Sequence, residues 1–141
     1  MKTVILDFDG TLDQTYTAIK TGKDTIKEMY AMGVILALTC NHEKKELENI
    51  LRQQGVANCF SVAIAADDKN TANKDTNVFN LIADHTDSTP SQVMVVGEST
   101  PNLALGKEAG INTCMIKKDK AGKPDEADYV INDLKALLDI V

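Results

Sequence analysis

Short apolar runs alternate along the chain with longer segments in which apolar residues recur every three or four positions. The short runs predict β-strands, because apolar residues at alternate or successive positions suit a strand that is buried on one or both faces. The alternation of such strands with helices is typical of a parallel α/β sheet. The expected strands cover residues 2–8, 34–39, 61–65, 92–96, 111–116 and 127–131.

The segments between these runs have helical spacing. Leu47, Ile50 and Leu51 form an i, i+3, i+4 stripe, and Gly55 follows where that helix would end. Residues 12–21 are expected to form at most a small flap. The predicted helices cover about residues 22–32, 43–54, 75–86 and 100–109, with an amphipathic closing helix over 132–141. The sequence contains no internal repeat and no interdomain linker. It therefore predicts one Rossmann-like domain over residues 1–141, a doubly wound parallel sheet in three α/β/α layers.

Polar residues gather where the predicted strands end. The carboxyl ends of parallel strands meet at one edge of the sheet, and ligands bind in the crevice beyond them. Asp7 and Asp9 start out on the same face of their strand, so their charges repel unless a cation or a substrate balances them. Gly10 then lets the backbone turn sharply. The other residues expected at this edge are Thr39, Asn41, Gly97, Glu98, Ser99 and, from the start of the next helix, Lys74.

This set of side chains suits phosphoryl transfer, which depends on positioning and on neutralising the charge of phosphate oxygens. Asp7 can serve as a nucleophile and form an aspartyl-phosphate. Mg²⁺ prefers hard oxygen ligands, and an ion that bridges Asp7 and Glu98 would remove the repulsion between the carboxylates. Asp9 can protonate the leaving oxygen and later deprotonate water.

The composition of the chain limits the classes of molecule that it is expected to bind and the compartment in which it is expected to lie. A formal net charge of −6 argues against non-specific nucleic-acid binding, whereas a cation and a local lysine still permit a small anionic substrate. No apolar run approaches the about 20 residues that span a bilayer, and no signal peptide is evident. The three cysteines form no CxxC pair, which indicates free thiols and a cytoplasmic protein. Cys40 has no basic partner, so we expect a structural thiol there rather than a nucleophile.

Four motifs occur in order along essentially the whole chain. They are DFDGTL at 7–12, Thr39 followed by Asn41, Lys74 ahead of a helix, and GESTPN at 97–102 before a helix that ends in Ala-Gly. Together they resemble the four motifs of the haloacid dehalogenase superfamily of aspartate-nucleophile phosphatases. The resemblance implies the Rossmann-like α/β fold of this superfamily, with Mg²⁺ as the cofactor. It also implies a phosphate ester as the substrate, because position 9 is an aspartate.

The resemblance also implies a role for each matching residue. Asp7 would be the nucleophile and a metal ligand, and Asp9 the general acid/base whose backbone carbonyl also meets the metal. The catalytic set is Asp7, Asp9 and Lys74; the substrate-binding set is Gly10, Thr39, Cys40, Asn41 and Lys74; and the metal set is Asp7, Asp9, Glu98 and Asn102.

The chain departs from the family pattern in three places. Glu98 replaces the usual aspartate, Asn102 stands where a second acid is common, and Asp75 rather than proline follows Lys74. There is also no room for a mobile cap between Asp9 and Thr39 or after the third strand. We therefore expect a capless member whose site is open to large substrates or covered by a neighbouring subunit in a homo-oligomer.

Two other functions fit parts of the sequence. With Glu98 and Asn102, the chain can be a weak or inactive relative with a binding or regulatory role. It can also be a receiver-type signalling domain that accepts phosphate on Asp67 or Asp68, although that class leaves the GTL and GES segments unexplained. His42 and His85 are expected at the surface.

Overall fold

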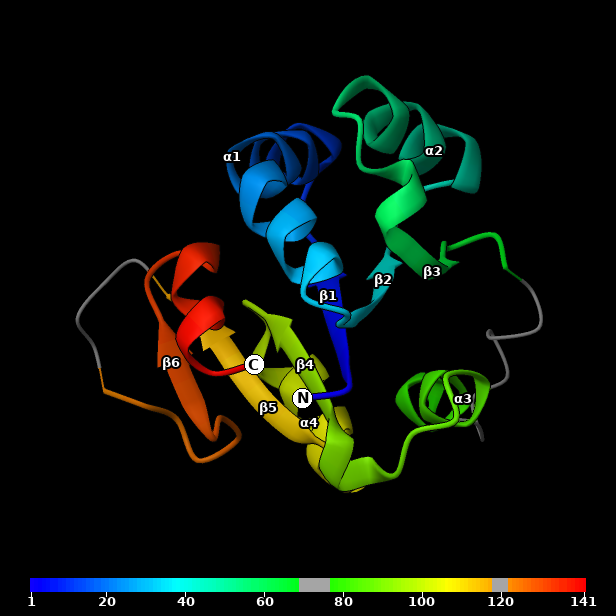
Figure 1. Cartoon of the computed structure of the whole chain (residues 1–141). Coiled ribbons are helices and arrows are strands. Elements are labelled where there is room, and N and C mark those ends of the chain that lie inside the picture. The colour runs from blue at the N-terminus through cyan, green and yellow to red at the C-terminus, as the bar shows by residue number, and fades with distance from the viewer. Residues whose placement is uncertain (69–76, 118–121) are drawn as a thin grey trace.

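The computed structural model describes residues 1–68, 77–117 and 122–141 (Figure 1). Within these ranges six strands form one parallel sheet in the order β3-β2-β1-β4-β5-β6. The order reverses at β1, so the carboxyl ends of β1 and β4 flank the crevice where ligands bind in such sheets. The strands are β1 (Thr3–Phe8), β2 (Ile35–Cys40), β3 (Phe60–Ile64), β4 (Val93–Gly97), β5 (Asn112–Ile116) and β6 (Tyr129–Ile131). All six predicted strands are confirmed, with bounds that differ by at most two residues.

Helices cover both faces of this sheet. One face packs against α1 (Leu12–Ala31) and α2 (Lys44–Gln53), and the other against α3 (Val78–His85) and α4 (Thr100–Glu108) (Figure 1). Two buried apolar clusters fill the two interfaces, with Ile19, Leu47 and Leu6 in one and Phe79, Leu103 and Ile5 in the other. The three-layer α/β/α fold is therefore confirmed, and the described residues include no cap domain. No helix in these ranges is long and apolar enough to cross a bilayer.

The first helix begins ten residues earlier than predicted, so the expectation of a flap over residues 12–21 is wrong. Thr11 and Gln14 form a capping box: Thr11 Oγ1 accepts from Gln14 N at 3.2 Å, and Gln14 Oε1 accepts from Thr11 N at 2.8 Å. Gly22, predicted to begin the helix, lies inside it. A Cβ at Gly22 would lie 2.7 Å from Leu134 Cδ2, so the glycine makes room for the C-terminal segment.

That C-terminal segment is a short 3₁₀ helix, Leu134–Asp139, rather than the predicted α-helix. Leu134 lies against Gly22, and Leu137 is fully buried in the core. Residues at i and i+3 align on one side of a 3₁₀ helix, which lets both leucines face the protein over a single turn. The predicted amphipathic segment therefore does bury an apolar side, but it forms a 3₁₀ helix rather than an α-helix.

Gly106 sets how closely α4 approaches the sheet. A Cβ at this position would lie 2.9 Å from Val95 Cγ1 and 3.0 Å from Thr113 Cγ2. We expect Gly106→Ala to lower the free energy of unfolding by about 1–3 kcal/mol, because overpacking outweighs alanine's better helix propensity. Urea unfolding measures this, with Gly122→Ala as the control, since nothing lies within 4 Å of a Cβ there. Equal stability of the two variants would show that α4 can move away from the sheet without cost.

Candidate active site

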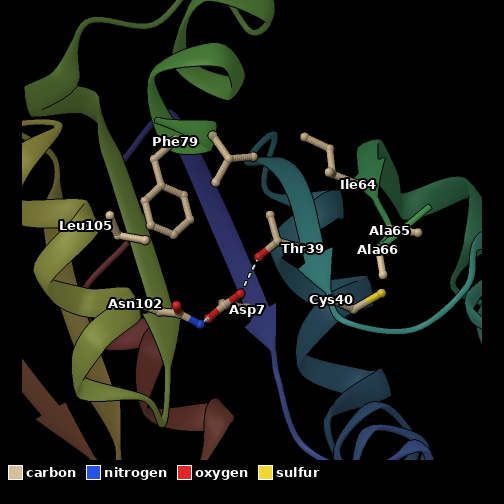
Figure 2. A pocket seen from close by; sticks show the side chains of 10 residues that line it. Asp7, Thr39, Cys40, Ile64, Ala65, Ala66, Phe79, Asn102 and Leu105 are labelled. Carbon is tan, nitrogen blue, oxygen red and sulfur yellow. Dashed lines mark hydrogen bonds between the residues drawn. The ribbon is translucent and has the colours of Figure 1, made fainter. Parts of the chain in front are cut away.

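Asp7 and Thr39 lie side by side at the carboxyl ends of β1 and β2. The two residues are partners in the strand register, and alternation places them on the face of the sheet that holds Ile5 and Ala37. Thr39 is buried, and its Oγ1 donates to Asp7 Oδ1 at 2.5 Å. Figure 2 shows this pair in the wall of a pocket. The sheet itself therefore fixes one oxygen of the Asp7 carboxylate.

The first turn of α4 supplies a partner for the second oxygen. Asn102 Nδ2 donates to Asp7 Oδ2 at 2.7 Å (Figure 2). Ser99 caps this helix, accepting at Oγ from Asn102 N at 3.4 Å, so the helix start is held next to the strand end. A Cβ at Gly97 would lie 3.4 Å from both Cβ and Oδ2 of Asp7, so the end of β4 lies directly beside the Asp7 side chain.

Asp9 lies one step further out and is exposed. Its Oδ2 is 3.4 Å from Asn102 Nδ2, and its backbone carbonyl accepts from Asn41 Nδ2 at 2.9 Å. Gly10 follows in the turn that leads into α1, where a Cβ would collide with the Gln14 side chain. The acid is thus held through its backbone, while its carboxylate faces solvent next to Asp7.

Burial raises the pKa of Asp7 above its usual value, and the charge of Asp9 raises it further. The hydrogen bonds from Thr39 and Asn102 act in the opposite direction but do not cancel the effect of burial. Both hydrogen-bond partners are neutral. An ionised Asp7 therefore lacks a compensating positive charge among the residues that are described, and a cation or a cationic side chain would stabilise it.

A pocket of about 250 Å³ lies against Asp7. One end is polar, formed by Asp7, Thr39 and Asn102, and the opposite wall is apolar (Figure 2). The remaining lining residues are Cys40, Ile64, Ala65, Ala66, Val78, Phe79 and Leu105. Drug-sized ligands usually occupy about 300–1,000 Å³, so this pocket suits a smaller molecule.

Comparison with protein families decides the assignment. The family model for haloacid dehalogenase-like hydrolases matches residues 13–116, which is more than half of the chain. The chain belongs to this family. The matched range begins just after Asp9, so the roles of Asp7 and Asp9 depend on the geometry of the site.

Relatives and solved structures agree with the family assignment. The chain is 29% identical over 134 residues to a phosphoglycolate phosphatase of Vibrio cholerae, a match that covers 92% of this chain and 58% of that protein. It is 28% identical over 112 residues to a bifunctional riboflavin kinase/FMN phosphatase of Arabidopsis thaliana, covering 77% of this chain and 30% of that one. A haloacid dehalogenase-superfamily hydrolase from Geobacter sulfurreducens has the same fold, with a TM-score of 0.76, 15% identity and full coverage of both chains. The chain thus spans little more than half the length of the Vibrio relative.

The oxygen atoms at this site suit the hard cation that the family pattern implies. Asp7 offers a half-buried carboxylate with no positively charged partner among the described residues, and Asp9 offers a backbone carbonyl, whereas Asn102 turns its amide nitrogen toward Asp7. Glu98 follows Gly97 and is exposed. No three His, Cys, Asp or Glu side chains are grouped for metal binding in the part of the chain that the structure covers. Coordination by Glu98 and Asn102 therefore stays a prediction.

The structure brings most of the predicted site residues together. Asp7, Asp9, Thr39, Asn41 and Asn102 form one hydrogen-bonded group. Gly10 lies in the adjoining turn, and Glu98 is exposed at the end of β4. Lys74, predicted to bind the phosphoryl group, lies outside the described residues, as do the first residues of the predicted helix 75–86.

Cys40 lines the pocket as a half-buried thiol. Its pKa is raised, chiefly by burial and also by the charge of nearby Asp7, whereas a hydrogen bond to the backbone of His42 acts against the rise. Because a raised pKa keeps the sulfur protonated, this environment favours a structural thiol over a nucleophile.

His42 was wrongly expected to be a plain surface residue, although the exposed His85 matches its prediction. His42 is half-buried, and its Nε2 lies 2.8 Å from Oγ1 of the buried Thr15 on α1. Its carbonyl accepts from Ala66 N at 2.9 Å, which joins the loop after β2 to the loop after β3. A threonine on the apolar face of α1 was the sequence signal that a polar partner would lie opposite.

Asp67 and Asp68 act as local caps rather than as pocket residues. Asp67 Oδ1 accepts from Lys44 N at 2.9 Å at the start of α2. Asp68 Oδ2 accepts from Ala65 N at 2.6 Å, and its Oδ1 forms an ion pair with Lys44 Nζ at 3.6 Å. Neither lines the pocket next to Asp7. These contacts, with the family assignment, argue against a receiver-type phosphate acceptor at either residue.

Proposed function

We propose that the chain is a Mg²⁺-dependent phosphomonoester hydrolase that works through an aspartyl-phosphate on Asp7. The observation that carries the proposal is the half-buried Asp7 carboxylate, held on both oxygens and facing a small pocket. Its relatives named phosphoglycolate phosphatase make small phosphate esters the first substrates to test.

In the first step, an oxygen of Asp7 attacks phosphorus, and the bond between phosphorus and the ester oxygen breaks. Asp9 donates a proton to the leaving oxygen, which departs as an alcohol. In the second step, Asp9 takes a proton from water as the water attacks phosphorus, and Asp7 is released as a carboxylate with inorganic phosphate. Thr39 and Asn102 keep the attacking carboxylate oriented throughout.

The cation would be held by Asp7, by the backbone carbonyl of Asp9 and by Glu98. When bound, Mg²⁺ would neutralise charge on the phosphoryl oxygens and on the carboxylates. Lys74 is proposed to add a further positive charge at the phosphoryl group, and Gly10 and Asn41 to shape the turn around it.

Metal removal is expected to abolish the reaction. We expect EDTA to lower the rate of p-nitrophenyl phosphate hydrolysis by at least about a hundredfold, and excess Mg²⁺ to restore it, because the metal neutralises charge in the transition state. Release of p-nitrophenol measures this, and 2-phosphoglycolate is assayed in parallel by phosphate release. Failure to hydrolyse any phosphate ester would favour the inactive relative with a binding or regulatory role. Light scattering on the same sample distinguishes a monomer, in which no neighbouring subunit can cover the site, from a homo-oligomer.

A further inference from the structure

Asn102 contacts both acids of the proposed site. Its Nδ2 lies 2.7 Å from Asp7 Oδ2 and 3.4 Å from Asp9 Oδ2, and no other side chain in the described ranges hydrogen-bonds both carboxylates. A primary amide carries two hydrogens on one nitrogen, so a single nitrogen can donate to two oxygens. The contact with Asp7 is the stronger one by distance.

The surroundings of Asn102 fix which end of the amide faces the acids. If the amide were turned by 180°, Oδ1 would take the place of Nδ2 and meet Asp7 Oδ2 with no hydrogen between the two oxygens. The backbone cannot relieve this contact easily, because Asn102 lies in the first turn of α4, which Ser99 caps. The amide therefore presents its donor, rather than its oxygen, to the carboxylates.

We propose that Asn102 is a positioning residue, whose amide hydrogens hold the Asp7 and Asp9 carboxylates, and that it does not coordinate the cation. Thr39 fixes Oδ1 of Asp7 and Asn102 fixes Oδ2, so the carboxylate is oriented before metal or substrate binds. The inference deepens the proposed function, since it concerns the same site, and it revises the sequence-based assignment of Asn102 as a metal ligand.

The residue at position 102 also determines how much negative charge the site carries. An acid at position 102 would replace a donor by a third acceptor, facing two carboxylates at close range. Without metal, three such groups would repel one another, whereas a divalent cation would relieve the repulsion. An asparagine and an aspartate at this position should therefore respond in opposite ways to metal removal.

Thermal unfolding in EDTA and in Mg²⁺ tests the proposal without requiring catalysis. In EDTA we expect Asn102→Asp to melt at least about 4 °C below Asn102→Ala, and Mg²⁺ to reverse that order. Asn112→Asp is the matched control. Asn112 Nδ2 bonds the carbonyls of Ser91 and Val93, away from the pocket, so this change should lower the melting temperature equally in both buffers.

Metal affinity, measured by titration calorimetry, supplies the second readout. Asn102→Ala and Thr39→Val each remove one hydrogen bond to Asp7, so we expect the two variants to bind Mg²⁺ within about threefold of each other. We expect Asn102→Asp to bind Mg²⁺ at least about tenfold more tightly than the unchanged protein, because ligand charge sets affinity. A loss of affinity in Asn102→Ala at least about tenfold larger than the loss in Thr39→Val would overturn the proposal and make Asn102 a ligand. Asn102→Asp as stable in EDTA as Asn102→Ala would overturn it as well, whether or not the protein binds metal or hydrolyses esters.

If the protein is active, kinetics add a third readout that a purely structural role would not produce. Misplacing a reacting group by about 1 Å can cost about a hundredfold in rate. We expect Asn102→Ala to lower kcat by about that factor with KM nearly unchanged, since Asn102 orients the nucleophile. An equal fall in kcat for Asn102→Ala and Asn112→Ala would count against positioning.

Discussion

Asp7→Asn is expected to abolish phosphate-ester hydrolysis while making the folded protein more stable. The amide cannot attack phosphorus, so we expect kcat to fall by at least about 10³-fold, as when other enzymes lose a nucleophile. The half-buried carboxylate is costly to the fold when ionised, because burial raises its pKa above the usual value. Removing that charge should add about 0.5–2 kcal/mol to the free energy of unfolding, the usual size of a stabilising substitution.

The gain in stability should depend on pH in a defined direction. Because the pKa of Asp7 is higher in the folded state, the folded protein binds this proton more tightly than the unfolded chain. The contribution of Asp7 is therefore most favourable below the ordinary aspartate pKa and is lost as pH rises through the raised, folded value. The difference between Asp7→Asn and the unchanged protein should be small in acid and largest near neutral pH.

Urea unfolding at pH 3.5 and 7.5 measures this difference, in EDTA so that no metal contributes. Asp24→Asn, a change of an exposed aspartate on α1, is the control and should alter stability at neither pH. A less stable Asp7→Asn protein at pH 7.5 would contradict the view that the site carries uncompensated charge. Full retention of hydrolysis would show that Asp7 is not the nucleophile.

Asp9→Asn should lower kcat by about 10²–10⁴-fold, the usual contribution of a general acid/base. The deficit should be larger for an alkyl phosphate than for p-nitrophenyl phosphate, because p-nitrophenolate leaves without needing a proton. Stability should change little, since Asp9 is exposed and Asn41 binds its backbone carbonyl, which the variant keeps.

Steady-state assays with both substrates measure this second effect. Asp13→Asn, at an exposed aspartate in the first turn of α1, serves as the control for a lost negative charge near the site. If Asp9→Asn impaired both substrates to the same extent, Asp9 would act in binding or in metal coordination rather than in protonating the leaving group.

The sequence could predict the sheet and the placement of Asp7 and Thr39 at one edge of it, because both follow from strand periodicity. Buried strands with continuous apolar residues leave few alternatives, and the carboxyl ends of parallel strands meet at one edge. The ends of the helices were harder to predict from the sequence than the strands. The start of α1 depends on a two-residue capping box, and the C-terminal 3₁₀ helix packs through Leu134 against Gly22, which lies far away in the sequence.

The contacts within the site were the least predictable part. The sequence places Asn102 near Asp7, but which end of its amide faces the carboxylate depends on the two acids around it. The bond between His42 and Thr15 joins a loop to a helix, and the apolar pocket wall joins the end of β3 to α3 and α4. Such contacts depend on packing between elements, which local patterns do not encode.

Helices α1, α2 and α4 begin soon after β1, β2 and β4, so their amino-terminal ends lie at the same edge of the sheet as Asp7. Backbone dipoles give each such end a partial positive charge of about half an elementary charge. In a chain with a net charge of −6, this edge is therefore where the backbone itself favours an anion. Part of the attraction for a phosphate ester is thus set by the topology and would survive the loss of any single charged side chain.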